Sequence, residues 1–69
     1  MNKPCAEAIR ESSLKAIIEV SKIAKLAREQ CSPQESAILM RAAGNLIGLI
    51  ETDILMTIYR EHPELDDLA

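Results

Sequence analysis

Residues 37–58, AILMRAAGNLIGLIETDILMTI, constrain the fold of this chain more than any other segment. The segment has a helical period. At 100° per residue, the residues that lie close to one line are Leu39, Ala43, Leu46, Ile47, Ile50, Ile54 and Ile58. A surface helix would carry charge on its opposite side, whereas here that side holds only a narrow polar strip with apolar flanks. One amphipathic neighbour cannot cover such a helix. We therefore expect the chain to associate with further copies of itself or with another protein.

The sequence argues against a membrane span at this segment. A transmembrane helix needs about 20 mostly apolar residues, but Arg41, Glu51 and Asp53 interrupt the run. Placing a charged side chain at the centre of a bilayer is costly. We therefore expect no membrane association.

A capping box at the break between two helical patterns defines the hairpin. Ser32 can accept a hydrogen bond from a free amide, Pro33 suits the first helical position, and Glu35 can reach back to the amide of Ser32. The sequence predicts one domain, residues 1–69, with a first helix at about 3–30, a tight bend at 31–32, a second helix at about 33–61 and an acidic tail at 62–69. Because the bend is so short, the helices should run antiparallel as an αα-hairpin. The tail either frays or folds back, and we expect partial order with Leu65 and Leu68 against the hairpin.

The first helix is amphipathic. Its apolar arc consists of Cys5, Ile9, Ser13, Ala16, Ile17, Val20, Ile23, Ala24, Ala27 and Cys31. Both cysteines lie on or beside this arc, so we expect buried free thiols rather than redox or metal-binding groups. Leu14 and Ile18 lie off the arc as an i,i+4 pair. They are either simply exposed or form a second contact patch.

The composition indicates helix packing and a need for assembly. Hydrophobic residues make up 48% of the chain, but aromatic residues only 1%, so the core must be aliphatic. A chain of 69 residues is near the size at which a single core becomes marginal. We predict an all-α fold, an antiparallel two-helix hairpin that assembles into a helical bundle, most simply a four-helix bundle formed by a homodimer. This plan resembles Rop-type hairpins, which dimerise into four-helix bundles, and small secretion chaperones; the resemblance is architectural and does not imply a shared function.

The second helix is expected to provide the oligomer interface. Glycine within a helix costs about 1 kcal/mol relative to alanine, and the GxxxG pair Gly44 and Gly48 would offset this cost by close approach of another helix. The expected interface residues are Leu39, Ala43, Gly44, Leu46, Ile47, Gly48, Leu49, Ile50, Ile54, Met56 and Ile58. Candidate contacts with a further partner are Leu14, Ile18, Arg41, Asn45, Asp53 and Tyr59. For Asp53, an ion pair at the rim of an oligomer interface is the alternative.

The sequence contains no pattern that predicts catalysis, a metal or a cofactor. The single histidine, His62, ends the second helix, whereas Cys31 lies at the bend, so the two cannot meet within one chain. Glu-x-x-His pairs, CxxC spacing and a phosphate-binding glycine loop are all absent from the sequence. We therefore expect a protein that is not an enzyme.

These features predict a small homo-oligomeric helical interaction module, an adaptor, regulator or chaperone-like binder, that presents an assembled helix surface to a protein partner. We expect a cytoplasmic location, because residues 1–12 lack the apolar segment of a signal peptide. One alternative is one half of a hetero-complex. Another is a nucleic-acid-associated regulator that uses the basic residues Arg10, Lys15, Lys22, Lys25 and Arg28. The net charge of −3 argues against nucleic acid.

Overall fold

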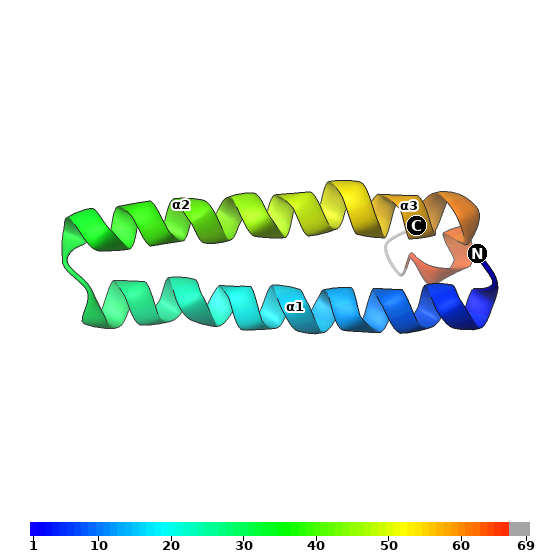
Figure 1. Ribbon diagram of the computed structural model, residues 1–69, viewed down its shortest axis with the longest axis horizontal. Coiled ribbons are helices and arrows are strands. Elements are labelled where there is room, and N and C mark those ends of the chain that lie inside the picture. Colours follow the sequence, from blue (N-terminus) through cyan, green and yellow to red (C-terminus); the bar gives the residue numbers. More distant parts are fainter. Residues whose placement is uncertain (67–69) are drawn as a thin grey trace.

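The computed structural model describes residues 1–66 as two long helical segments folded back on each other (Figure 1). The first is α1 (Lys3–Gln30). The second helical segment is continuous and consists of α2 (Pro33–Leu49), the π-helical turn η1 (Ile50–Leu55) and α3 (Met56–Glu61). A single 3-10 turn, η2 (Pro63–Leu65), follows. The molecule measures 45 × 19 × 15 Å, and residues 1–66 contain no strand. The all-α fold and the antiparallel hairpin are thus confirmed.

Both long segments begin at a side-chain cap. Asn2 accepts a hydrogen bond from the N–H of Cys5 at 2.9 Å. Ser32 Oγ accepts from the N–H of Glu35 at 3.2 Å, and Glu35 Oε1 accepts from the N–H of Ser32 at 3.0 Å, so the predicted capping box is confirmed. The bond from the Ser32 N–H holds the pKa of the Glu35 carboxyl below its usual value, since it favours the carboxylate.

The π-helical turn adds one residue to a turn of the second helical segment. The N–H of Met56 donates to the carbonyl oxygen of Glu51, five residues earlier instead of four. Within the same stretch, Thr52 Oγ1 donates to the carbonyl oxygen of Gly48 at 2.8 Å. Such side-chain bonds to the preceding turn commonly distort helices. The extra residue changes which side chains face α1 in the rest of the segment.

This change of register was not predicted from the sequence. In an unbroken α-helix the residue one heptad after Ile50 would be Thr57. In the structure Ile58 takes that place and is only 1% exposed, while Leu55 follows Ile50 into the core. The expectation that Ile54 shares the line of Ile50 and Ile58 is wrong: Ile54 is 41% exposed. The prediction assumed 100° per residue throughout, which the π-helical turn violates.

The core lies mainly at the end of the hairpin where α3 lies beside the start of α1. Ala6, Leu55 and Ile58 are buried there, with Ile17, Ile50, Tyr59 and Leu65 packed against them. Elsewhere in residues 1–66 the buried apolar side chains are Ala27 and Ala43. Alanine removes little apolar area from water. The half of the hairpin near the bend therefore has only a thin core of its own.

One neighbouring helix covers a narrower stripe of α1 than the sequence predicts. Ser13 is buried and its hydroxyl donates to the carbonyl oxygen of Ile9 at 2.7 Å. Cys5 and Cys31, however, are exposed. The prediction of buried thiols is therefore wrong, because the two cysteines lie at the edges of the predicted arc.

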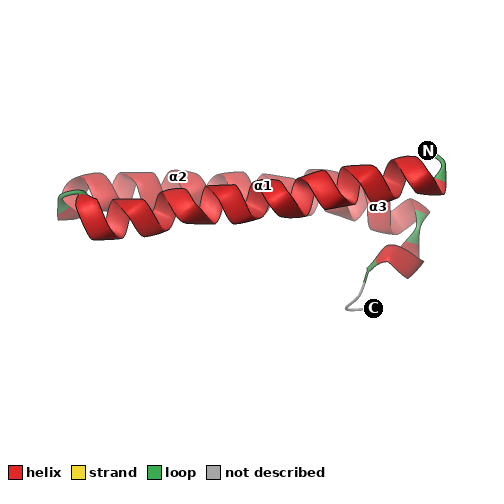
Figure 2. Cartoon of the chain, turned by 90° about the horizontal axis from the view of Figure 1, so that it is seen from below, coloured by secondary structure: helices red, strands yellow, loops and turns green. Residues whose placement is uncertain are grey.

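The described part of the acidic tail, residues 62–66, contains the turn η2. In η2 the N–H of Leu65 donates to the carbonyl oxygen of His62 at 3.0 Å, and the N–H of Asp66 donates to that of Pro63 at 3.1 Å. Leu65 packs against the core, as expected. Figure 2 shows η2 on one side of the plane of the two helices. Leu68, the other leucine expected to fold back, lies outside the described residues.

Deletion of Thr52 is expected to leave the fold intact and its stability equal or higher. The deletion removes the extra residue of the π-helical turn, so a regular α-helix would place Leu55 and Ile58 in their present positions. Deletion of Asn45, an exposed residue of α2, is the matched control. The Asn45 deletion would shift every later residue by one helical position and so place Glu51 where Ile50 now faces α1. We therefore expect a marked fall in stability. Thermal unfolding followed by circular dichroism compares the two; greater damage from the Thr52 deletion would contradict the assigned register.

Candidate protein-interaction surface

The hairpin exposes more area than a compact monomer of its mass. A folded protein of 7.6 kDa is expected to expose about 4,300 Å², whereas this chain exposes 5001 Å². The excess is close to the roughly 800 Å² that each partner contributes to a standard protein–protein interface. The exposed side chains include thirteen large apolar residues. The molecule therefore has the area for one interface and the apolar character to form it.

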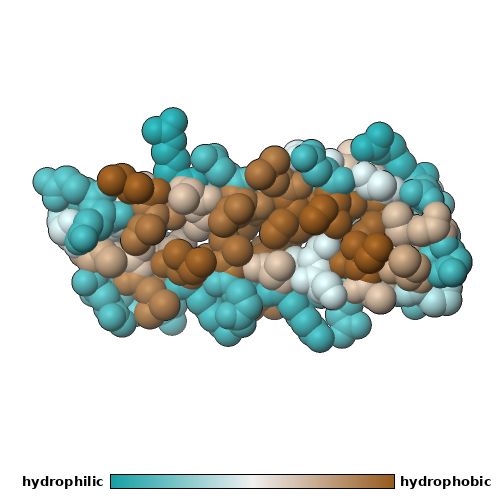
Figure 3. Space-filling view, viewed as in Figure 1, coloured by the Kyte–Doolittle hydropathy of each residue, from teal (hydrophilic) through white to brown (hydrophobic). Residues whose placement is uncertain are grey.

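One face of the hairpin carries a continuous apolar band. Figure 3 shows this band along the boundary between the two helices, with polar side chains confined largely to the edges. A shallow groove on the hairpin is lined by Ile9, Ala16, Ile50 and Ile54. On α1, Ile23 follows Ala16 by one heptad and so lies on the same side of the helix. On the second helical segment, Leu46 lies one heptad after Leu39. Ile54 follows Leu46 by eight residues, which is one heptad plus the extra residue of η1. We call this surface the seam face: Ile9, Ala16, Ile23, Leu39, Leu46 and Ile54.

The seam face widens where larger side chains border it. Leu49 is 55% exposed and Ile38 68% exposed, and both lie just outside Leu46 and Leu39 on the second helical segment. Isolated exposed apolar residues are ordinary on a monomer. A continuous band of them is typical of a surface that is covered by another molecule.

The residues expected at an interface divide into two groups in the structure. Leu39, Leu46, Leu49, Ile54 and Met56 are exposed and accessible to a partner. Ala43 and Ile58 are buried by the chain itself, and Ile47 and Ile50 are half-buried between the helices. Fewer of the predicted interface residues are therefore accessible than the sequence suggests. The exposed side chains of Ile9 and Ile23 on α1 add to the accessible apolar surface.

The two glycines do not make a close contact within the hairpin. A Cβ atom built on Gly44 or Gly48 would meet no heavy atom within 4 Å outside the local helix. The expected close helix approach is thus not made by α1. Any packing advantage of these glycines would have to come from another chain.

A second groove lies on the side of the hairpin that carries the tail. Its lining comes from α1, the second helical segment and the tail: Arg10, Leu14, Ile17, Glu51, Leu55, Met56, Tyr59 and Asp66. We call it the tail groove. Two of the proposed partner contacts, Leu14 and Tyr59, lie in it. Asp66 forms part of the wall, so the position of the tail determines the shape of this groove.

The remaining candidate partner residues do not form one cluster with the tail groove. Ile18 is exposed on α1, and Arg41 and Asn45 are exposed one turn apart on α2. Asp53 is exposed in η1 and accepts a hydrogen bond from the Thr52 hydroxyl at 3.2 Å. The structure therefore places Asp53 at the surface rather than in a core.

The basic residues of α1 are partly neutralised by neighbouring carboxylates. Lys15 Nζ lies 3.1 Å from Glu11 Oε1, and Lys22 Nζ lies 2.8 Å from Glu19 Oε1. A nucleic-acid interface would need a positive surface free of such pairs. These two pairs therefore lower the net positive charge on this part of α1.

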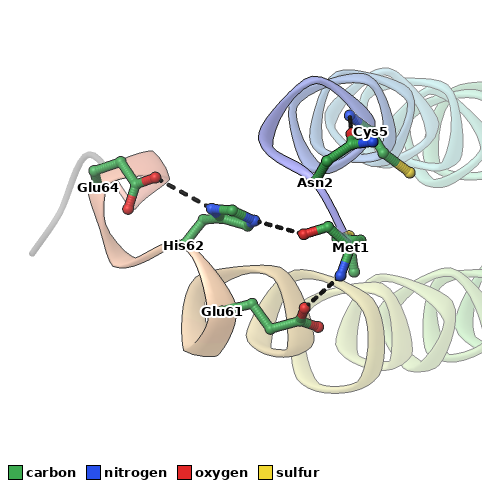
Figure 4. Close-up of polar contacts among 6 residues, drawn as sticks. All are labelled: Met1, Asn2, Cys5, Glu61, His62 and Glu64. Atoms are coloured by element: carbon green, nitrogen blue, oxygen red, sulfur yellow. Dashed lines mark hydrogen bonds and ion pairs between the residues drawn. The ribbon is translucent and has the colours of Figure 1, made fainter.

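Polar contacts join the start of the chain to α3 and η2 (Figure 4). The amino group of Met1 donates to Glu61 Oε1 at 2.7 Å. This bond raises the pKa of the amino group and lowers the pKa of the Glu61 carboxyl. His62 Nε2 lies 3.1 Å from the carbonyl oxygen of Met1 and Nδ1 lies 3.3 Å from Glu64 Oε1. His62 therefore links η2 to the start of the chain.

Within residues 1–66, no three His, Cys, Asp or Glu side chains come together as metal ligands would. In the same part of the chain, no helix combines the length and the apolar character needed to cross a membrane.

Comparisons of the chain with models of known protein families, with curated proteins and with solved structures found no match.

Proposed function

We propose that this chain is a helical interaction module that dimerises through the seam face into a four-helix bundle. The observation that carries the proposal is the continuous apolar band of Figure 3 on a hairpin whose own core is mostly alanine near the bend. Pairing two such faces would give each helix a second neighbour, as in four-helix bundles. The dimer would then present its outer helix surfaces to a protein partner, in the role of an adaptor, regulator or chaperone-like binder.

Charge and area both favour a second copy as the occupant of the seam face. Residues 1–31 carry six basic and four acidic side chains, a balance of +2, and residues 32–69 carry two basic and seven acidic ones, a balance of −5. In a two-fold dimer with both bends at the same end, each α1 lies over the partner's second helical segment. Opposite charges then face each other, which favours this arrangement over a dimer with the two bends at opposite ends. The excess exposed area matches the size of one such interface.

The exposed cysteines allow a direct test of this arrangement. Cys31 lies at the bend and Cys5 in the first turn of α1, at opposite ends of the hairpin. With both bends at one end, a short bismaleimide should link Cys31 to Cys31 of the partner, and the Cys5→Ser variant should still give a covalent dimer. With the bends at opposite ends, Cys5 would meet Cys31 of the partner and the same variant would lose the product.

Two outcomes of this experiment would contradict the proposal. A product that requires both cysteines would contradict the orientation, and no product at any protein concentration would contradict the dimer itself. The Cys5→Ser, Cys31→Ser double variant controls for linkage through amines. If a different protein covers the seam face in place of a second copy, the chain alone should give no cross-linked product. A product should then form only after that protein is added.

We propose a cytoplasmic location, since Cys5 and Cys31 are exposed free thiols, which persist in a reducing compartment.

A further inference from the structure

His62 occupies an unusual position between two hydrogen-bond acceptors. Its Nε2 atom lies 3.1 Å from the carbonyl oxygen of Met1, and its Nδ1 atom lies 3.3 Å from a carboxylate oxygen of Glu64. Figure 4 shows the ring between the two, with the chain start on one side and η2 on the other. The side chain is only 18% exposed, so water competes weakly for these bonds.

Both bonds can exist together in only one protonation state. A backbone carbonyl only accepts, and an ionised carboxylate also only accepts. The pKa of the Glu64 carboxyl is lowered, first by its own backbone N–H and also by His62, so that it is ionised. For both bonds to form, each ring nitrogen has to carry a proton, as in the imidazolium; a neutral ring can donate to only one of the two acceptors.

We propose that His62 is a proton-sensitive clasp that holds η2 in place and so controls the tail groove. With the imidazolium present, both bonds fix η2 against the start of the chain, and Leu65 stays packed against the core cluster that contains Leu55. When the ring loses its proton, one bond is lost and the tail is released more often. The groove then opens, and Leu55 and Tyr59 become accessible to a partner.

The charges around the ring set the pH range of the clasp. The amino group of Met1 and Lys3 lie on the α1 side, Glu61 is on α3 and Glu64 is on η2. The pKa values of Glu61 and Glu64 are lowered, so their contribution is present at neutral pH and is lost only as the pH falls through those lowered values. The imidazolium contribution has the opposite sign, because protonation gives the ring a second donor and deprotonation removes it. The clasp is therefore tighter with the protonated ring than with the neutral one.

Tyr59 provides the readout, because it is the only aromatic residue of the chain and lies in the tail groove. Acrylamide quenching of its fluorescence measures how freely solvent reaches the ring. Between pH 5.5 and pH 8 the docked-to-released ratio of the tail should fall by about two- to twelvefold, as for the loss of one net hydrogen bond. The quenching constant of the native chain should rise accordingly.

Two variants separate the clasp from other titrating groups. His62→Gln cannot gain or lose a proton in this range and should show quenching that does not change with pH. Glu64→Gln keeps the histidine but removes the carboxylate, and it should reduce the pH response by about half or more. A native chain with pH-independent quenching, or a His62→Gln variant with the native response, would overturn the proposal. Because quenching reports on the tail groove alone, its outcome is distinct from that of the dimer tests on the seam face.

Discussion

Replacement of Leu46 by Asp is expected to convert the proposed dimer into monomers. Leu46 is 48% exposed near the middle of the seam face. In the proposed dimer this position is covered, and an uncompensated carboxylate there would lose its hydration without gaining a partner. Truncation or disruption at the centre of an interface costs about 2–4 kcal/mol, which corresponds to a dissociation constant raised by about 30- to 1,000-fold. Sedimentation equilibrium of native and variant chains at the same concentration measures the change.

The matched control for this prediction is Ile18→Asp. Ile18 is 58% exposed, lies in the middle of α1 and is on the other side of the hairpin from the seam face. The substitution adds the same charge and a similar loss of helix propensity. It should leave the association unchanged. Equal dissociation by both variants, or by neither, would show that the seam face is not the interface.

Replacement of Ile58 by Ala should produce the largest loss of stability among single substitutions in the core. Ile58 is 1% exposed and packs with Ala6 and Leu55. Removing a buried isoleucine side chain to Cβ costs about 2–5 kcal/mol through lost burial and the cavity that remains. For a domain of this size that is a large share of the total. Urea unfolding of the native and variant chains at one protein concentration measures the difference.

Ile18→Ala serves as the comparison for this core substitution, because Ile18 makes little use of its side chain in the fold. We expect a change within about 0.5 kcal/mol, as for ordinary surface positions. If Ile58→Ala were no more destabilising than Ile18→Ala, the π-helical turn would not place Ile58 in the core.

Local features of the fold could be predicted because their chemistry is contained in a few neighbouring residues. The capping box at Ser32 and Glu35 depends on side chains three positions apart, and both bonds are present. The antiparallel hairpin follows from the shortness of the bend. Neither inference requires knowledge of what the helices pack against.

The register of the second helical segment could not be predicted from a constant helical period. A signal was nevertheless present in the sequence: strict heptad continuation from Ile50 leads to Thr57 and then to polar or charged positions, whereas a step of eight leads to Ile58. Sequence patterns that change spacing in this way indicate an extra residue in a turn. The same shift moves Ile54 out of the core and onto the seam face.

The candidate surfaces were only partly predictable for a related reason. Which apolar residues remain exposed depends on which ones the hairpin itself uses, and that division follows from the register. The contacts of His62 with Met1 and Glu64 were not foreseen at all, because they join residues 61 positions apart and 2 positions apart through the folded arrangement of both termini. The sequence places His62 only at the end of the second helix.

The mass of the native chain in solution tests the central claim most directly. Size-exclusion chromatography with multi-angle light scattering, over a range of concentrations, should give twice the 7.6 kDa of one chain. The seam face would then be covered by a second copy, as its apolar band and excess area require. A mass of 7.6 kDa at every concentration, from a chain that remains folded and free of any other protein, would contradict the dimer.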